Sequence, residues 1–69
     1  MTEDEYSIIN FLKQSPDNLF TRREIARKAV KRNVFEENNH WADAPLAALV
    51  ARREVEQDDA GLYRVRRSA

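Results

Sequence analysis

The motif Thr-x-x-Glu occurs twice near the start of the chain, at Thr2 and Glu5 and again at Thr21 and Glu24, and a segment of helical periodicity follows each copy. In such a capping box the threonine hydroxyl and the glutamate carboxylate accept hydrogen bonds from backbone N–H groups that a helix leaves unpaired at its start. The two boxes therefore predict two separate helices and fix where each one begins.

The first helix is expected to run from residue 2 or 3 to residue 14. Its buried face is formed by Ile8, Ile9 and Leu12, which recur at helical spacing. The helix cannot continue into Ser15, because the residue before a proline, here Pro16, avoids the helical conformation.

A short extended piece at residues 19 and 20 leads into the second helix, which is expected to begin at Arg22. Asn33 is its predicted C-terminal stop, because asparagine tolerates the left-handed conformation that commonly ends a helix. The buried stripe of this helix is formed by Ile25, Ala26, Ala29 and Val30.

Residues 34–42 follow no clear period and are predicted to form a loop, with room for one helical turn. The third helix is predicted to start at Asp43 or Ala44, with Pro45 at its first helical position, where the missing N–H costs nothing. The helix ends near residue 52 or 53, and the side chains that face inward are Leu46, Leu49 and Val50.

The last part of the chain has the pattern of a β-hairpin, with strands at residues 55–57 and 62–65 and a turn at residues 58–61. The turn contains Gly61, the only glycine of the chain, at a position where a positive φ is often needed. Apolar and basic residues alternate after the turn, which predicts one apolar face and one basic face.

The order helix, short strand, helix, helix, hairpin resembles a winged helix-turn-helix domain over nearly the whole chain. The likeness is carried by Phe20-Thr21-x-x-Glu24-Ile25-Ala26, by Leu46-x-x-Leu49, by Val55 and by Gly61-Leu62-Tyr63-Arg64-Val65. The expected fold is therefore an α+β winged helix that spans residues 1–69 as a single domain. It has a three-helix core, a short strand after the first helix and a C-terminal two-stranded β-hairpin as its wing.

One feature departs from that resemblance. Helices 2 and 3 of a helix-turn-helix are usually joined by about three or four residues, whereas here the join runs from Asn33 to about Ala42. The usual pose of the domain on DNA therefore does not carry over directly to this chain.

An enzyme is not expected from this composition. The chain has one histidine, one glycine and no cysteine, so neither a phosphate-binding glycine loop nor a thiolate metal site is available. We expect no catalytic residue, no metal, no cofactor and no small-molecule substrate.

The acidic N-terminus differs from a signal peptide, and no apolar run approaches the roughly 20 residues of a membrane span. The expected location is the cytoplasm, away from membranes.

DNA is the favoured partner, although the net charge is zero. Residues 22–32 hold six of the 12 basic residues and only one acid, Glu24. In winged helices the second helix commonly meets the DNA backbone, so the resemblance implies phosphate contacts there, in a transcription regulator or accessory factor. The hairpin adds Arg64, Arg66 and Arg67. The predicted DNA-binding residues are Arg22, Arg23, Arg27, Lys31, Arg52, Arg64, Arg66, Asn39 and His40.

A protein partner, or a second copy of the chain, is the alternative. The resemblance makes helix 3 the recognition helix, yet its outward face is alanine, which offers none of the donors and acceptors that read base edges. Phe35 and Trp41 are expected to extend the core, and their alternative role is that of exposed anchors for a partner. The alternative interface consists of Phe35, Trp41, Ala47, Ala48 and Ala51.

Overall fold

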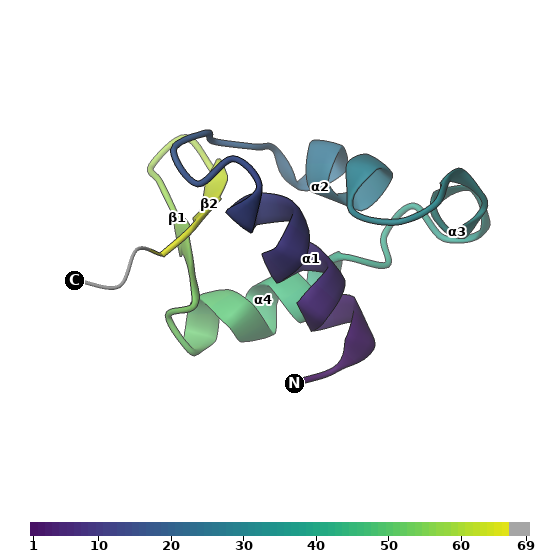
Figure 1. Cartoon of the computed structure of the whole chain (residues 1–69), viewed down its shortest axis with the longest axis horizontal. Coiled ribbons are helices and arrows are strands. Elements are labelled where there is room, and N and C mark those ends of the chain that lie inside the picture. Colours follow the sequence, from purple (N-terminus) through teal and green to yellow (C-terminus); the bar gives the residue numbers. More distant parts are fainter. Residues whose placement is uncertain (67–69) are drawn as a thin grey trace.

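The computed structural model describes residues 1–66 and has a small α+β fold, so the α+β part of the predicted fold is confirmed (Figure 1). Within these residues there are four helices, rather than the three expected, and one hairpin. The elements follow one another as α1 (Glu3–Lys13), α2 (Arg22–Lys28), α3 (Arg32–Glu37), α4 (Asp43–Ala51), β1 (Val55–Gln57) and β2 (Tyr63–Val65).

Both predicted capping boxes are formed. The Glu5 backbone N–H donates to Thr2 Oγ1 at 3.2 Å, and the Thr2 N–H donates to Glu5 Oε1 at 2.9 Å. The second box repeats the arrangement at the start of α2, with distances of 3.0 and 3.1 Å. The predicted starts of α1 and α2 are therefore confirmed.

The prediction that the second helix continues to Asn33 is wrong. α2 ends at Lys28 with Ala29 as its C-cap, and Asn33 lies inside α3. The last carbonyls of a helix have no partner within it. One of them, the carbonyl of Ala26, accepts a hydrogen bond at 2.8 Å from the indole Nε1–H of Trp41. A tertiary contact thus satisfies the end of α2.

The predicted loop at residues 34–42 contains most of α3, which is short and has no fully buried residue. α3 lies at one end of the long axis of the molecule (Figure 1). α4 then begins at Asp43, so Pro45 is its third residue rather than its first. The proline is still tolerated there, because the first four N–H groups of a helix have no partner within the helix.

The hairpin forms as predicted, with Val55 opposite Val65 and Glu56 opposite Arg64. Gly61 has a φ of +85°, which a residue with a side chain rarely adopts. On the other side of β2, Phe20 forms a bridge with Tyr63 through two backbone hydrogen bonds of 2.9 and 2.7 Å. The predicted extended piece after α1 therefore lies beside the hairpin.

One hydrophobic cluster joins these elements. Trp41 is only 9% exposed within it, so its predicted role in the core is confirmed and its alternative role as an exposed anchor is wrong. Phe35 is half-buried and packs against the same cluster. The buried members are Ile8, Ile9, Leu12, Ile25, Ala26, Trp41, Ala42, Leu46, Leu49, Val55 and Val65.

Candidate nucleic-acid interface

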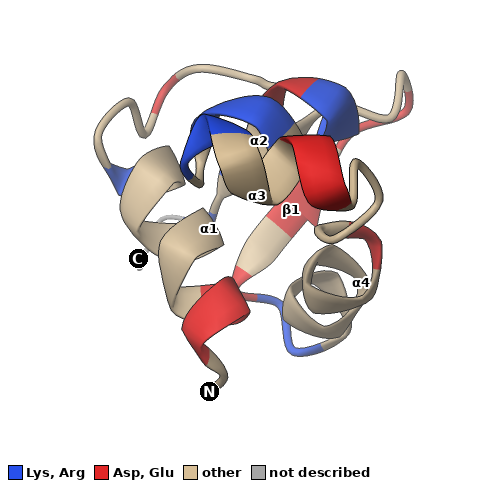
Figure 2. Ribbon diagram, turned by 90° about the vertical axis from the view of Figure 1, so that its right-hand side faces the viewer, with Lys and Arg blue, Asp and Glu red and all other residues tan. Residues whose placement is uncertain are grey.

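The basic residues of α2 lie on its exposed side (Figure 2). Arg23 and Arg27 are one helical turn apart, and neither forms an ion pair within residues 1–66. Lys31 is also exposed and unpaired there, but it is the N-cap of α3. Arg23 and Arg27 therefore share one face of α2, whereas Lys31, expected four residues further along the same helix, lies beyond the end of α2.

Glu24 is the only acidic residue of α2, and its carboxylate forms no ion pair with Arg23 or Arg27. Its carboxylate accepts the Thr21 N–H in the capping box and lies 4.0 Å from Lys28 Nζ, the pair expected at i, i+4 spacing. The Thr21 backbone hydrogen bond, with a smaller contribution from Lys28, lowers the pKa of Glu24 below its usual value. The carboxylate of Glu24 therefore contacts its own helix and the N-cap of that helix, and it does not neutralise Arg23 or Arg27.

Two adjoining hollows lie between α2 and the segment that follows it, and together they are called the α2–α3 groove below. The larger one, about 690 Å³, is lined by Arg23, Arg27, Arg32, Phe35 and Glu36. The smaller one, about 350 Å³, is lined by Thr21, Arg22, Arg23, Phe35, Asn39, His40 and Asp43. Arg23 and Phe35 line both. The groove brings together five of the nine predicted DNA-binding residues: Arg22, Arg23, Arg27, Asn39 and His40.

Asp43, the first residue of α4, organises one end of this groove. Its two carboxylate oxygens lie 3.4 Å from Arg22 Nε and 3.5 Å from His40 Nδ1. The His40 backbone N–H also donates to Asn38 Oδ1 at 3.1 Å. These contacts hold Arg22 and His40 beside each other, at the cost of pairing Arg22 with an acid.

Arg52, predicted to flank the DNA, is instead turned toward α1. It lies 3.2 Å from Glu5, a residue only 5% exposed, and 2.9 Å from Glu54. The pKa of Glu5 is lowered first by its hydrogen bond from the Thr2 backbone and then by the guanidinium of Arg52. The hydrogen bonds to Glu5 and Glu54 raise the pKa of Arg52 in turn. Arg52 is therefore part of the packing of α1 against α4.

The predicted hairpin cations are engaged as well. Arg64 Nε lies 3.0 Å from Glu56 across the two strands, and Arg66 Nη1 donates to the backbone carbonyl of Arg53 at 3.4 Å. Arg67 lies outside the described residues. The hairpin thus contributes less uncompensated positive charge than its arginine count predicts.

The α4 face expected to read bases or to meet a partner carries alanine. Ala47 and Ala51 are exposed and Ala48 is half-buried. Neither hollow of the α2–α3 groove includes any of the three. This face therefore offers small apolar contacts and no hydrogen-bonding side chain.

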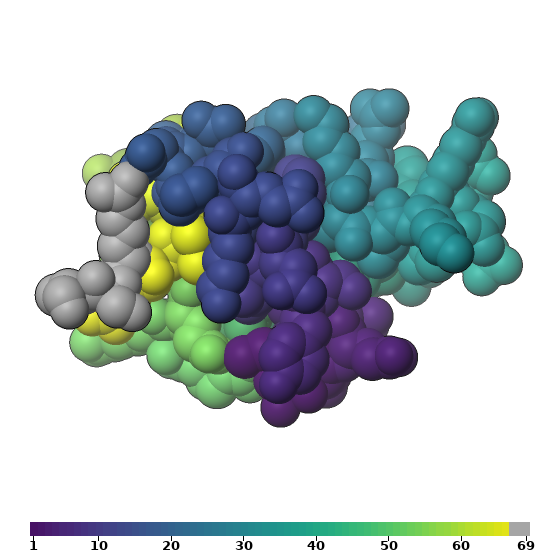
Figure 3. Space-filling model, in the orientation of Figure 1, coloured from purple at the N-terminus to yellow at the C-terminus, as the bar shows by residue number. Residues whose placement is uncertain are grey.

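Sequence reasoning missed Arg32 and Glu36 as neighbours of the site, because it did not predict α3. The signal was present: Arg32 and Glu36 are spaced at i, i+4, and their side chains pair at 2.8 Å. The pair lines the larger hollow, at the projecting end of the molecule (Figure 3).

Residues 1–66 contain no group of three or more histidine, cysteine or acidic side chains that could hold a metal ion. Nor does that part of the chain have a helix long and apolar enough to cross a membrane. A scan against models of known protein families, a search of curated proteins and a search of solved structures each found no match.

Proposed function

We propose that this chain is a small winged-helix protein that binds DNA through the basic side of α2, as a transcription regulator or accessory factor. The order of α1, the Phe20 bridge, α2, α4 and the hairpin supports the winged-helix assignment. In this assignment α3 is an insertion between the two helices of the helix-turn-helix.

The observation that carries the proposal is the difference in pairing among the cations. Arg23, Arg27 and Lys31 are exposed and have no acidic partner in the described part of the chain, whereas Arg52 and Arg64 do. A cation that is already paired must give up its acid before it can contact a phosphate. Arg23, Arg27 and Lys31 are therefore available to DNA. Lys13 and Arg53 are also exposed and unpaired within residues 1–66, but Arg23 and Arg27 in addition line the α2–α3 groove.

Binding of this kind fixes the protein on the backbone and reads little sequence. Phosphate contacts position a protein without carrying sequence information, and the alanine face of α4 adds no bidentate contact to a base. The affinity should therefore depend steeply on salt, because each neutralised phosphate releases counterions.

The test is the double variant Arg27→Glu with Lys31→Glu, measured on a labelled mixed-sequence duplex over a series of salt concentrations. We expect at least roughly tenfold weaker binding at low salt and a logarithmic salt slope smaller by about two. The matched control is Lys13→Glu with Arg53→Glu, which changes the net charge equally at two other exposed cations that have no ion pair within residues 1–66.

The control should lose clearly less affinity than the α2 variant. Unchanged binding after the Arg27 and Lys31 reversal would remove this surface from the proposal. Equal losses in the two double variants would mean that only net charge matters, and the assignment to α2 would then be wrong.

One observation favours a second candidate, a protein partner on α4. Ala47 and Ala51 are exposed on a helix face that has no hydrogen-bonding side chain, and such a face permits close approach of another surface. Ala47→Arg should abolish an association that uses this face and leave the thermal unfolding curve unchanged. Sedimentation velocity of the wild-type protein and the Ala47→Arg variant, each alone and with a captured partner, measures the association. An association that survives the substitution excludes the α4 face.

A further inference from the structure

We propose that the α2–α3 groove holds an unpaired strand of DNA, with one base stacked on Phe35 and the adjacent phosphates on Arg23 and Arg27. The inference deepens the DNA binding proposed above and rests on it. It replaces the double helix with a single strand as the preferred ligand.

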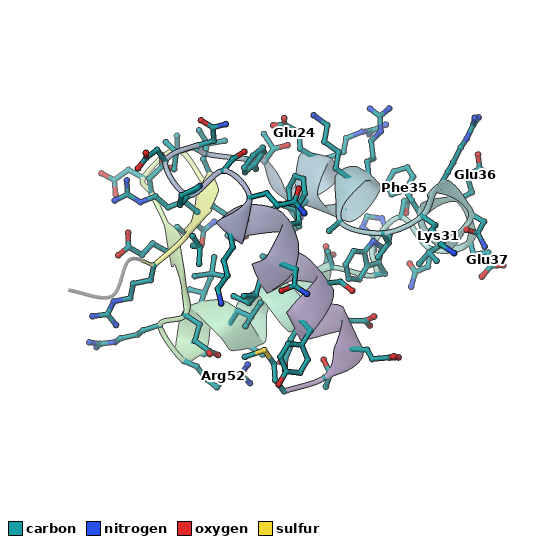
Figure 4. The ribbon with its side chains drawn as sticks, viewed as in Figure 1. Glu24, Lys31, Phe35, Glu36, Glu37 and Arg52 are labelled. Carbon is teal, nitrogen blue, oxygen red and sulfur yellow. The ribbon has the colours of Figure 1, made fainter. Side chains whose placement is uncertain are left out.

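Phe35 is the only aromatic carbocycle that lines the groove, and it lines both hollows. The residue is half-buried and packs against the hydrophobic cluster, so the core restrains the ring while part of the residue remains open to the groove. Figure 4 shows Phe35 between α2 and α3. A restrained ring beside a polar groove is a platform on which a base can stack.

The free positive charge of the groove lies close to this ring. Arg32 is paired with Glu36, so these two lining residues contribute no net charge. Arg23 and Arg27 remain, separated by about 6 Å along the axis of α2, since a helix rises about 1.5 Å per residue. That separation suits two adjacent phosphates of one strand, and Arg23 reaches both hollows.

The position of the ring distinguishes a single strand from a duplex. Bases in a duplex are stacked on one another and present only their edges, which a phenyl ring cannot read and for which α4 offers only alanine. An unpaired base has a free face that stacks on an aromatic ring whatever its sequence. Asn39 and His40 line the smaller hollow and supply an amide and an imidazole for the edge of the stacked base.

The experiment compares a labelled thymidine oligonucleotide with a duplex of the same length at low salt, by fluorescence anisotropy. The wild-type protein should bind the single strand more tightly. Phe35→Leu keeps an apolar side chain against the core and removes the aromatic face. It should weaken single-strand binding about tenfold, in line with the loss of one stacked base, and leave duplex binding within about twofold. Phe35→Tyr should restore single-strand binding.

A second measurement leaves the protein intact, in case Phe35→Leu fails to fold. A strand of abasic sites keeps the phosphates and removes every base, so the wild-type protein should bind it about tenfold more weakly than the thymidine strand. Equal affinity for the abasic and thymidine strands overturns the stacking, and so does tighter binding of the duplex.

The two proposals fail in different ways. If neither ligand is bound, DNA binding itself is wrong. If the duplex is bound more tightly, and that binding is sensitive to Arg27 and Lys31 but not to Phe35, the proposed function stands and the single-strand inference falls.

Discussion

Two regions of this molecule are rich in arginine, and they use it differently. In the hairpin region, residues 52–66, Arg52 and Arg64 lie against glutamates and Arg66 against a backbone carbonyl. Arg53 is exposed there and has no ion pair within residues 1–66, but it lines neither hollow of the groove. In the α2–α3 region, residues 22–37, Arg23 and Arg27 have no acidic partner within the described residues and line a groove. Figure 4 shows Arg52 far from Lys31 and Phe35. The comparison teaches that the placement of acids, more than the number of cations, decides which basic surface is free to bind.

The largest expected effect comes from removing the contact between Trp41 and the C-terminal end of α2. Trp41→Ala deletes a buried side chain and the hydrogen bond to Ala26, and should cost about 3–5 kcal/mol. A core of this size supplies only about 3–5 kcal/mol in total, so the variant should be largely unfolded by circular dichroism.

Trp41→Phe is the matched control for that substitution. It keeps an aromatic ring and most of the buried volume but removes the indole N–H that donates to the Ala26 carbonyl, at a cost of about 1–3 kcal/mol in urea denaturation. A Trp41→Ala variant that melts like the wild-type protein would show that the α2–α3 region does not depend on this side chain.

The next largest effect is on DNA affinity, and it tests whether the arginines of the α2–α3 region and those of the hairpin region differ in binding. Arg23→Ala with Arg27→Ala should weaken DNA binding about tenfold, because two free phosphate contacts are lost. Arg64→Ala with Arg66→Ala removes the same charge from the hairpin and should change binding by no more than about twofold. Both doubles should unfold within about 1 kcal/mol of the wild-type protein, because exposed ion pairs contribute little. Equal losses of affinity in the two doubles would contradict the distinction between the regions.

The smallest effect is a pH dependence of stability at the contact between Glu5 of α1 and Arg52. Because the folded protein lowers the pKa of Glu5 below 4.5, the carboxylate stabilises the fold at neutral pH, and this contribution is lost as the pH falls through that lowered value. Glu5→Gln should therefore be modestly less stable than the wild-type protein at pH 7, and the difference should shrink in acid below about pH 4.

Glu3→Gln provides the control, because Glu3 is exposed in the same first turn and its side chain forms no hydrogen bond or ion pair within residues 1–66. Thermal unfolding of the three proteins between neutral and acidic pH measures the effect. A constant difference between Glu5→Gln and the wild-type protein across that range would exclude the link to ionisation.

Local signals in the sequence were enough to predict much of this fold. The capping boxes at Thr2 and Thr21 fixed two helix starts because both partners lie within one turn, and Gly61 located the hairpin turn because few residues adopt its φ. The end of α2 could not be predicted in this way, since it involves Trp41, which lies 15 residues beyond the carbonyl it contacts.

The candidate site was predictable in its residue types and less so in their pairing. The stripe of Arg23 and Arg27 follows from helical spacing alone. The pairing of Arg52 with Glu5 spans 47 residues and depends on how α1 packs against α4, which no local pattern contains. The pairing of Arg64 with Glu56 could have been predicted from the sequence, because the hairpin register places the two residues opposite each other.

Trp41 has a practical consequence beyond stability, because it is the only tryptophan of the chain. Its indole is buried and hydrogen-bonded where α2 meets the rest of the molecule, so its intrinsic fluorescence reports on that junction alone. A shift of the emission to longer wavelength without loss of secondary structure would reveal detachment of this segment before global unfolding. The chain therefore carries its own optical probe of local opening and needs no attached dye.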